Sequence, residues 1–244
     1  MQEQVEILGV LVDRIDLKRA VEEIERFIAE GQNRVVVTPN AEMIVQAQSD
    51  LRLKEIINRA DLALPDGIGV VLAAKLLGSP IPERGAGIDL VYELLARSRA
   101  KDYRFYFLGG APGVAEQAAK EVRQSYGRLN IATHHGYLSE GLAEEVINDI
   151  IEWSPDILLV GMGVPLQEKW LAAYRVQLSG TVGIGVGGTF DILAGVKDRA
   201  PLWVQQIGLE WLYRLRQEPK RLGRILRLPE FIIQVLKQKF NHQS

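Results

Sequence analysis

Short apolar segments rich in β-branched residues alternate with longer segments of helical periodicity along most of this 244-residue chain. The apolar runs predict strands over residues 5–12, 34–38, 62–64, 104–108, 130–134, 157–160 and 181–186. Apolar residues spaced three and four apart predict helices over residues 17–30, 41–59, 90–99, 114–126, 142–153 and 167–177. Because a helix between two strands is the usual connection of parallel strands, the alternation predicts an α/β fold with a mainly parallel sheet and helices on both faces.

A Rossmann-like sheet of this kind binds its ligands at the carboxyl ends of its strands. Glycine, proline and small polar residues gather at these strand ends, at 38–40, 65–67, 109–113, 135–137, 161–165 and 187–191. The carboxyl edge of the sheet is therefore where we look for functional residues.

Asp66 follows a predicted strand and offers a carboxylate at that edge. Such a group could take a proton from an attacking hydroxyl and act as a general base. It could also form an Asx turn with its own backbone, which its position alone favours. Thr38 and Asn40 follow the preceding strand, and Asn40 could instead be the N-cap of the helix beginning at Ala41. Arg84 is either a phosphate ligand or a loop charge in solvent.

Two glycine-rich loops at the same edge are candidates for diphosphate binding. Gly109 and Gly110 begin a loop that leads into a helix, whose first amides could face a diphosphate. The segment 183–188, which ends in Gly187 and Gly188, matches the letter pattern of a dinucleotide-binding loop. That match is weak, because the pattern belongs in the first strand–helix unit of a sheet and comes late in this chain. A nicotinamide-dependent oxidoreductase stays open as an alternative.

The residue types argue against several chemistries. No cysteine is present, which excludes disulfides, thiolate zinc sites and cysteine nucleophiles, and only three histidines occur. The sequence has no Asp-x-Asp motif and no Gly-x-Ser-x-Gly elbow, so it predicts neither a catalytic metal ion, nor another cofactor, nor a serine hydrolase. The start of the chain lacks the features of a signal peptide, and no apolar run approaches the roughly 20 residues of a membrane-spanning helix. We expect a cytoplasmic location.

The net charge of −2 hides an asymmetry between two parts of the chain. Residues 202–244 contain eight basic and three acidic residues among many aromatic and aliphatic ones, whereas residues 1–201 contain 21 basic and 28 acidic residues. We therefore expect an α/β catalytic domain over 1–201 and a basic, apolar helical tail over 202–244. The tail suits an anionic membrane surface, although a basic helix packed on the acidic body would have the same pattern. No nucleic-acid partner is expected.

Several motifs of the carboxyl edge resemble one known family when they are taken together. They are TPNAE at 38–42, LPDG at 64–67, PER at 82–84, GMGVPLQEKW at 161–170 and GVGGTFD at 185–191. The combination closely resembles the WecG/TagA/CpsF family of bacterial glycosyltransferases. Segments 199–201 and 208–215 fit the same family, so the resemblance spans the chain.

The resemblance implies transfer of an N-acetylmannosamine-type sugar from a UDP donor to N-acetylglucosamine on undecaprenyl diphosphate. In the wall teichoic acid branch of the family the donor is UDP-N-acetylmannosamine, and a β-1,4 linkage forms with inversion. Members of this kind work without a metal ion. The reaction is expected at the cytoplasmic membrane face, with the protein bound peripherally.

The resemblance also implies roles for individual residues. Asp66 becomes the general base that takes the proton from the acceptor 4-hydroxyl. The residues implied to bind substrate in the body are Thr38, Asn40, Arg84 and Gln167. In the tail, Arg214, Arg221 and Arg224 are spaced so that they lie near one face of a helix, and Pro219 predicts a break in that helix after Arg214. The tail is expected to close over the site and to meet the charge that grows on the departing diphosphate.

Three alternatives remain at this point. Within the family, the donor could carry N-acetylmannosaminuronic acid or another capsule sugar. Outside it, the chain could be the oxidoreductase considered above, or a non-catalytic membrane adaptor whose glycines only form turns. The sequence also leaves open whether copies of the chain associate through the outer helices of the sheet.

Overall fold

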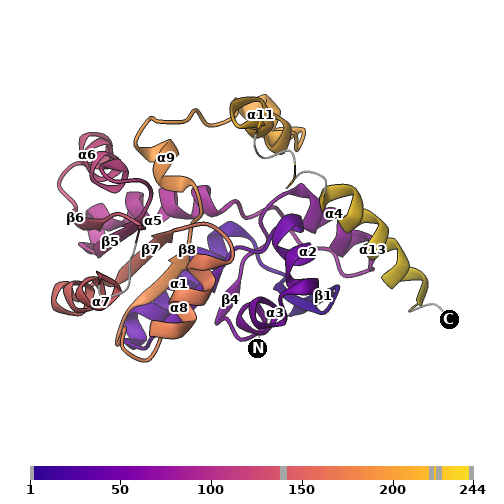
Figure 1. The fold of residues 1–244 in the computed structure, drawn as a ribbon, viewed down its shortest axis with the longest axis horizontal. Helices are drawn as coiled ribbons and strands as arrows, with labels where there is room; N and C mark the ends of the chain where they lie inside the picture. Colours follow the sequence, from indigo (N-terminus) through magenta and orange to yellow (C-terminus); the bar gives the residue numbers. More distant parts are fainter. Residues whose placement is uncertain (1–2, 138–141, 220–222, 224–226, 242–244) are drawn as a thin grey trace.

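The computed structural model describes residues 3–137, 142–219, 223 and 227–241 (Figure 1). Its centre is a six-stranded sheet in which every strand pairs in parallel, in the order β4-β3-β8-β7-β5-β6. The strands of this sheet are β3 (Arg34–Val37), β4 (Leu62–Ala63), β5 (Arg104–Gly109), β6 (Asn130–His134), β7 (Ile157–Gly161) and β8 (Val182–Gly185). The predicted α/β fold is therefore confirmed.

Helices cover both faces of the sheet, because successive residues of each strand point to opposite faces and most are apolar. Val36, Phe105 and Leu159 pack on one face, whereas Val37, Tyr106 and Leu158 pack on the other. The first face is covered by α1 (Leu17–Glu30), α5 (Gly87–Lys101), α6 (Val114–Tyr126) and α9 (Thr189–Leu193). The second is covered by α2 (Ala41–Ser49), α3 (Leu51–Asn58), α4 (Ile68–Leu76), α7 (Leu142–Trp153) and α8 (Leu166–Tyr174).

The first predicted strand, 5–12, is wrong in extent and in partner. The chain turns at Leu8 and Gly9, whose φ angles of 53° and 74° give a two-residue hairpin loop. The result is a separate antiparallel hairpin of β1 (Gln4–Ile7) and β2 (Val10–Asp13). Its apolar side chains join the core beneath α3 and α4. Leucine is an unusual turn residue, so the sequence does not indicate a turn at Leu8.

The predicted helix over 41–59 is two helices. Asp50 lies outside both helices, and its side chain accepts a hydrogen bond from the backbone N of Leu53 at the start of α3 (3.0 Å). The sequence also gave no prediction for α4, which is apolar around most of its circumference and therefore shows no clear helical period.

The described part of the tail forms three helices that lie against the body. They are α10 (Leu202–Gln206), α11 (Glu210–Gln217) and α13 (Arg227–Asn241). Figure 1 shows α11 joined to α9 by an extended segment, and α13 beside α2 and α4. The side chains of Phe231 and Val235 are buried on one side of α13. The Arg227 guanidinium donates a hydrogen bond to Gln46 Oε1 (3.1 Å).

The sequence allowed the alternative that a basic helix of the tail packs on the body, and α13 packs in this way. The other side of that helix stays exposed, with Ile232 and Ile233 more than half accessible to solvent. Among the described residues, no helix is both long enough and apolar enough to cross a membrane. Arg221 and Arg224 lie outside the described residues.

Candidate functional site

A cavity of about 160 Å³ opens at the carboxyl edge of the sheet, between the ends of β3 and β8. The helix that follows β3 covers one face of the sheet and the helix that follows β8 covers the other, so the chain leaves a crevice between them. We call this cavity the edge pocket. Its walls come from five segments of the body and from α11, and are lined by Thr38, Asn40, Glu42, Met43, Asp66, Ala86, Gly87, Ile88, Gly163, Val164, Gln167, Val186, Gly187, Gly188, Thr189, Glu210 and Arg214.

Asp66 lies in the wall of the edge pocket, just after β4. Its backbone N donates to the carbonyl of Pro39 (3.0 Å), which ties the segment to the loop after β3. The carboxylate accepts no hydrogen bond from any described residue, so the Asx turn that its position favours is absent from the described structure. The sequence pattern left the surroundings of this carboxylate open, and the fold makes Asp66 one of the residues that line the cavity.

Burial raises the pKa of Asp66 to about 6. The positive charges of Arg214 and Arg84 oppose this shift, while Glu210 and Asp89 add to it. A carboxyl group with a pKa near 6 is ionised at neutral pH and is a stronger base than an ordinary aspartate. It can therefore accept a proton from a hydroxyl placed in the pocket.

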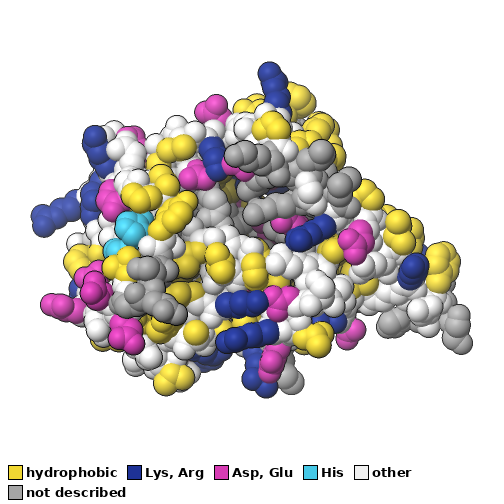
Figure 2. Space-filling view, viewed as in Figure 1, with side chains coloured by type: hydrophobic (Ala, Val, Ile, Leu, Met, Phe, Trp, Pro, Cys, Tyr) yellow, Lys and Arg dark blue, Asp and Glu magenta, His cyan; other side chains and the backbone are white. Residues whose placement is uncertain are grey.

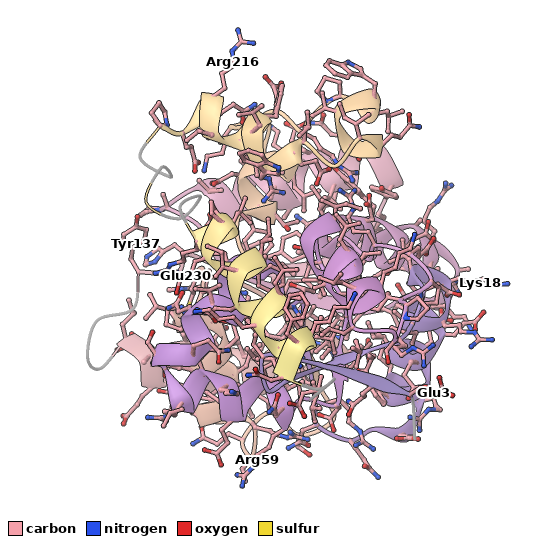
Figure 3. All side chains as sticks on the ribbon, turned by 90° about the vertical axis from the view of Figure 1, so that its right-hand side faces the viewer. Glu3, Lys18, Arg59, Tyr137, Arg216 and Glu230 are labelled. Atoms are coloured by element: carbon pink, nitrogen blue, oxygen red, sulfur yellow. The ribbon has the colours of Figure 1, made fainter. Side chains whose placement is uncertain are left out.

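Arg84 is not the solvated loop charge that the sequence allowed. Its guanidinium forms an ion pair with Glu210 of α11 (Nη1 to Oε2, 2.9 Å), and both side chains are largely buried. Glu210 and Arg214 are one helical turn apart, so both face the edge pocket. Arg216, by contrast, points away from the body (Figure 3). The tail thus brings one acidic residue, Glu210, and one basic residue, Arg214, to the site.

Thr38 and Asn40 both line the edge pocket, as the resemblance implied, and both also have structural partners. The Thr38 hydroxyl donates to the carbonyl of Gly185 (3.3 Å), which links β3 to β8. Asn40 is the N-cap of α2, because its Oδ1 accepts from the backbone N of Met43 (3.0 Å). The capping role considered for Asn40 is therefore confirmed.

Gln167 is buried beneath the pocket and connects two of its walls. Its Oε1 accepts from the backbone N of Gly163 (3.2 Å) and from that of Gly187 (2.9 Å). Its Nε2 donates to Glu168 Oε1 (2.7 Å), and Glu168 is completely buried. Neither the residue pattern nor the family resemblance predicts a role for Glu168.

The two glycine-rich loops differ in what they do. Gly187 and Gly188 line the edge pocket, whereas no described residue of 109–113 does. Gly109 is needed for packing, because a Cβ there would lie 2.5 Å from the carbonyl oxygen of Gly161. The backbone N of Gly110 donates to that same oxygen (3.1 Å), so this amide is already engaged.

The dinucleotide pattern over 183–188 has a packing explanation. Gly183 and Gly185 lie within β8, where a Cβ would lie 2.5 Å from Leu171 and 2.7 Å from Gln167, respectively. These two glycines allow α8 to pack closely on the sheet. They do not form a phosphate-binding turn, which removes the structural basis for the oxidoreductase.

Two acidic residues of the site were missed by the sequence reasoning. For Glu210 a signal existed, since an acid four residues before Arg214 on a helix shares its face. For Glu168 there was none, because nothing in its neighbours marks it as buried. In the described ranges, no group of three or more histidine or acidic side chains could hold a metal ion.

Comparisons with known proteins show the family of this chain. The model of the glycosyl transferase WecG/TagA/CpsF family matches residues 5–244. The N-acetylglucosaminyldiphosphoundecaprenol N-acetyl-beta-D-mannosaminyltransferases of Staphylococcus aureus strains MW2 and NCTC 8325 / PS 47 are each 36% identical to this chain over 239 residues. The match covers 97% of this chain and 93% of each relative. The chain therefore belongs to the WecG/TagA/CpsF family of glycosyltransferases.

Proposed function

We propose that the chain transfers N-acetylmannosamine from UDP-N-acetylmannosamine to the 4-hydroxyl of N-acetylglucosamine on undecaprenyl diphosphate, with inversion. The product is the β-1,4-linked disaccharide of a wall teichoic acid linkage unit. The names of the S. aureus relatives support the acceptor and the sugar. The observation that carries the proposal is the carboxylate of Asp66, which faces the edge pocket, has no described hydrogen-bond partner and has a raised pKa.

In the proposed mechanism Asp66 accepts the proton of the acceptor 4-hydroxyl as that oxygen attacks the anomeric carbon. The bond from the anomeric carbon to the diphosphate oxygen breaks, and UDP leaves with its electron pair. Arg214 lines the pocket and Arg84 lies beside it, so their charges can stabilise the negative charge that develops on the diphosphate. Thr38, Asn40 and the Gly187–Gly188 loop line the space for the sugar.

The tail also supplies a surface suited to the membrane in which the acceptor lipid resides. Its exposed large apolar side chains are Leu202, Trp203, Ile207, Leu209, Trp211, Leu212, Ile232, Ile233, Leu236 and Phe240. Figure 2 shows yellow apolar side chains at the top of the molecule and along α13 at the right. Apolar side chains interspersed with cations bind anionic bilayer surfaces. We propose peripheral association with the cytoplasmic face of the membrane through this surface.

The test of the reaction measures UDP release from UDP-N-acetylmannosamine with and without a short-chain lipid-diphosphate N-acetylglucosamine. We expect acceptor-dependent release by the unchanged protein and a loss of about 10³-fold in kcat for Asp66→Asn. Asp16→Asn is the matched control, because Asp16 is the N-cap of α1 and asparagine caps a helix equally well.

Each outcome of this assay has a defined meaning. Release that depends on the acceptor and survives in Asp66→Asn would show that another group is the base. Release only with UDP-N-acetylmannosaminuronic acid would change the donor and keep the site. No release with either donor would contradict the proposed reaction.

Membrane association is tested by sedimentation with phosphatidylglycerol vesicles. Trp203→Glu together with Ile233→Glu is expected to reduce the bound fraction, since it places charge in the apolar surface of the tail. Val176→Glu is the control, because Val176 is 87% exposed yet belongs to the body. Equal binding of the two variants would contradict the proposed surface.

A further inference from the structure

One side-chain amide holds two walls of the edge pocket at a set distance from each other. Gly163 lies in the loop after β7 and Gly187 in the loop after β8, and both backbone N–H groups donate to Gln167 Oε1. Both glycines line the pocket. The width of the pocket at this point therefore depends on how firmly the Gln167 amide is held.

The two N–H donors also decide which way the amide is turned. A side-chain oxygen must face two donors, so the Gln167 nitrogen must point the other way. There Nε2 donates to Glu168 Oε1 at 2.7 Å. Gly185 leaves room for this arrangement, since a Cβ at that position would lie 2.7 Å from Nε2. Among the described residues, Glu168 is the acceptor to which Nε2 donates.

Burial of Glu168 at this position costs free energy of folding. Its side chain has no exposed surface, and its second oxygen has no hydrogen-bond partner among the described residues. A buried carboxyl group with an unpaired oxygen destabilises a folded protein, and an apolar side chain of similar size would cost less. Burial also raises the pKa of Glu168 to about 7. Packing alone therefore does not explain a glutamate beneath the pocket.

We infer that Glu168 is a positioning residue for the edge pocket. It holds the Gln167 amide in place, and the amide in turn fixes the positions of the Gly163 and Gly187 loops relative to each other. The inference rests on the proposed function, which makes the edge pocket the donor site. A charge-bearing or strongly polar acceptor on Nε2 also polarises the amide and strengthens the two bonds to its oxygen. Glu168 itself does not line the pocket.

The test combines amide exchange with ligand binding in the full-length protein. In Glu168→Leu the acceptor is lost while the volume is nearly kept, and in Glu168→Gln an acceptor oxygen remains. We expect Glu168→Leu to speed hydrogen exchange of the Gly163 and Gly187 amides about tenfold, the upper effect of one lost hydrogen bond. The affinity for UDP, measured by calorimetry, is expected to fall several-fold. Glu168→Gln is expected to restore most of both properties.

The matched control is Thr181→Val, which removes one buried side-chain hydrogen bond at the opposite edge of the sheet, from Thr181 Oγ1 to the carbonyl of Pro155 (2.9 Å). It is expected to change neither readout. The Gly110 amide, which donates to Gly161, serves as an internal reference for exchange.

Unchanged exchange at Gly163 and Gly187 in Glu168→Leu, or unchanged affinity for UDP, would overturn the inference. The same is true if the Gly110 amide accelerates equally, since that would indicate general loosening. Failure of the unchanged protein to bind UDP is a different result, because it would contradict the proposed function itself.

Discussion

The loop after β8 and the loop after β5 are both rich in glycine and both end a strand at the same edge of the sheet, yet only the first lines the pocket. The crevice between β3 and β8 is open. At the ends of β5 and β7, in contrast, Gly136 packs closely on the neighbouring loops, since a Cβ there would lie 3.0 Å from Gly109 Cα and 3.3 Å from the Met162 side chain. The Gly136 backbone N donates to the carbonyl of Gly110 (3.0 Å).

Glycine therefore serves two purposes at the carboxyl edge of the sheet. In the loop after β5, glycine lets backbone approach backbone, and the loop becomes part of the packed interior. In the loop after β8, Gly188 has a nearest non-neighbouring atom at 3.8 Å from the position of a Cβ, so the space beside it is open to a ligand. Substitutions should therefore affect stability at one loop and binding at the other.

For the comparison of the two loops, the largest effect is expected for Gly109→Ala. The added methyl group would lie 2.5 Å from a backbone oxygen, at a φ of 150° that alanine rarely adopts. We expect the free energy of unfolding to fall by about 3 kcal/mol, as measured by urea denaturation. The folded fraction should bind UDP with unchanged affinity, and a selective loss of affinity would break the comparison.

Arg214→Ala is expected to lower kcat by about 10²-fold, because it removes a cation from beside the developing negative charge. Arg216→Ala is the control on the same helix, since Arg216 points away from the body. Steady-state kinetics with saturating acceptor measure both. Equal losses in the two variants would show that α11 acts through its overall charge and not through the pocket.

Gly188→Ala is the counterpart of Gly109→Ala on the pocket side. Its φ of −83° suits alanine, so we expect the free energy of unfolding to change by less than about 0.5 kcal/mol. The methyl group enters the space beside the pocket, and the KM for the donor is expected to rise about tenfold, or ~1.4 kcal/mol. A stability loss as large as that of Gly109→Ala would remove the distinction between the loops.

The smallest effects concern the titration of Asp66, whose pKa is raised to about 6. The base must be ionised, so kcat/KM is expected to fall about tenfold per pH unit below pH 6. The raised pKa means that the folded state binds the proton more tightly than the unfolded chain, so stability declines as pH rises from about 4 to about 6. After allowance for solvent screening, Asp66→Asn should recover about 1 kcal/mol at pH 7.

Thermal melting of the unchanged protein and of Asp66→Asn across pH 4–7 checks this sign. If the melting temperatures of the two proteins run parallel over the whole range, the pKa of Asp66 is not raised. The pH profile of kcat/KM is measured on the unchanged protein alone.

The parallel sheet and most of its helices could be predicted because each strand is a short apolar run and each helix has its own period. The order of the strands could not, since nothing local says that β8 lies between β3 and β7. That order decides where the crevice opens. The hairpin was missed for a local reason, because its turn uses Leu8 in a conformation that leucine seldom adopts.

The residue pattern alone predicted the candidate site only where a residue stands at a strand end, whereas the family resemblance also implied Gln167 and Arg214, which line the edge pocket from helices. Thr38, Asn40 and Asp66 stand at strand ends, and all three line the edge pocket. The pairing of Arg84 with Glu210 joins residues 126 positions apart and depends on where α11 docks, which periodicity does not contain. The same is true of Gly187 and Gln167, whose hydrogen bond joins the loop after β8 to the first turn of α8.

The proposed donor site is the crevice between β3 and β8. A crystal structure of Asp66→Asn with UDP-N-acetylmannosamine tests it most directly, because the variant should bind the donor without turning it over. We predict the sugar between residue 66 and Gly188, with the diphosphate beside Arg214. Nucleotide density on the 109–113 loop, with the edge pocket empty, would contradict the proposed donor site.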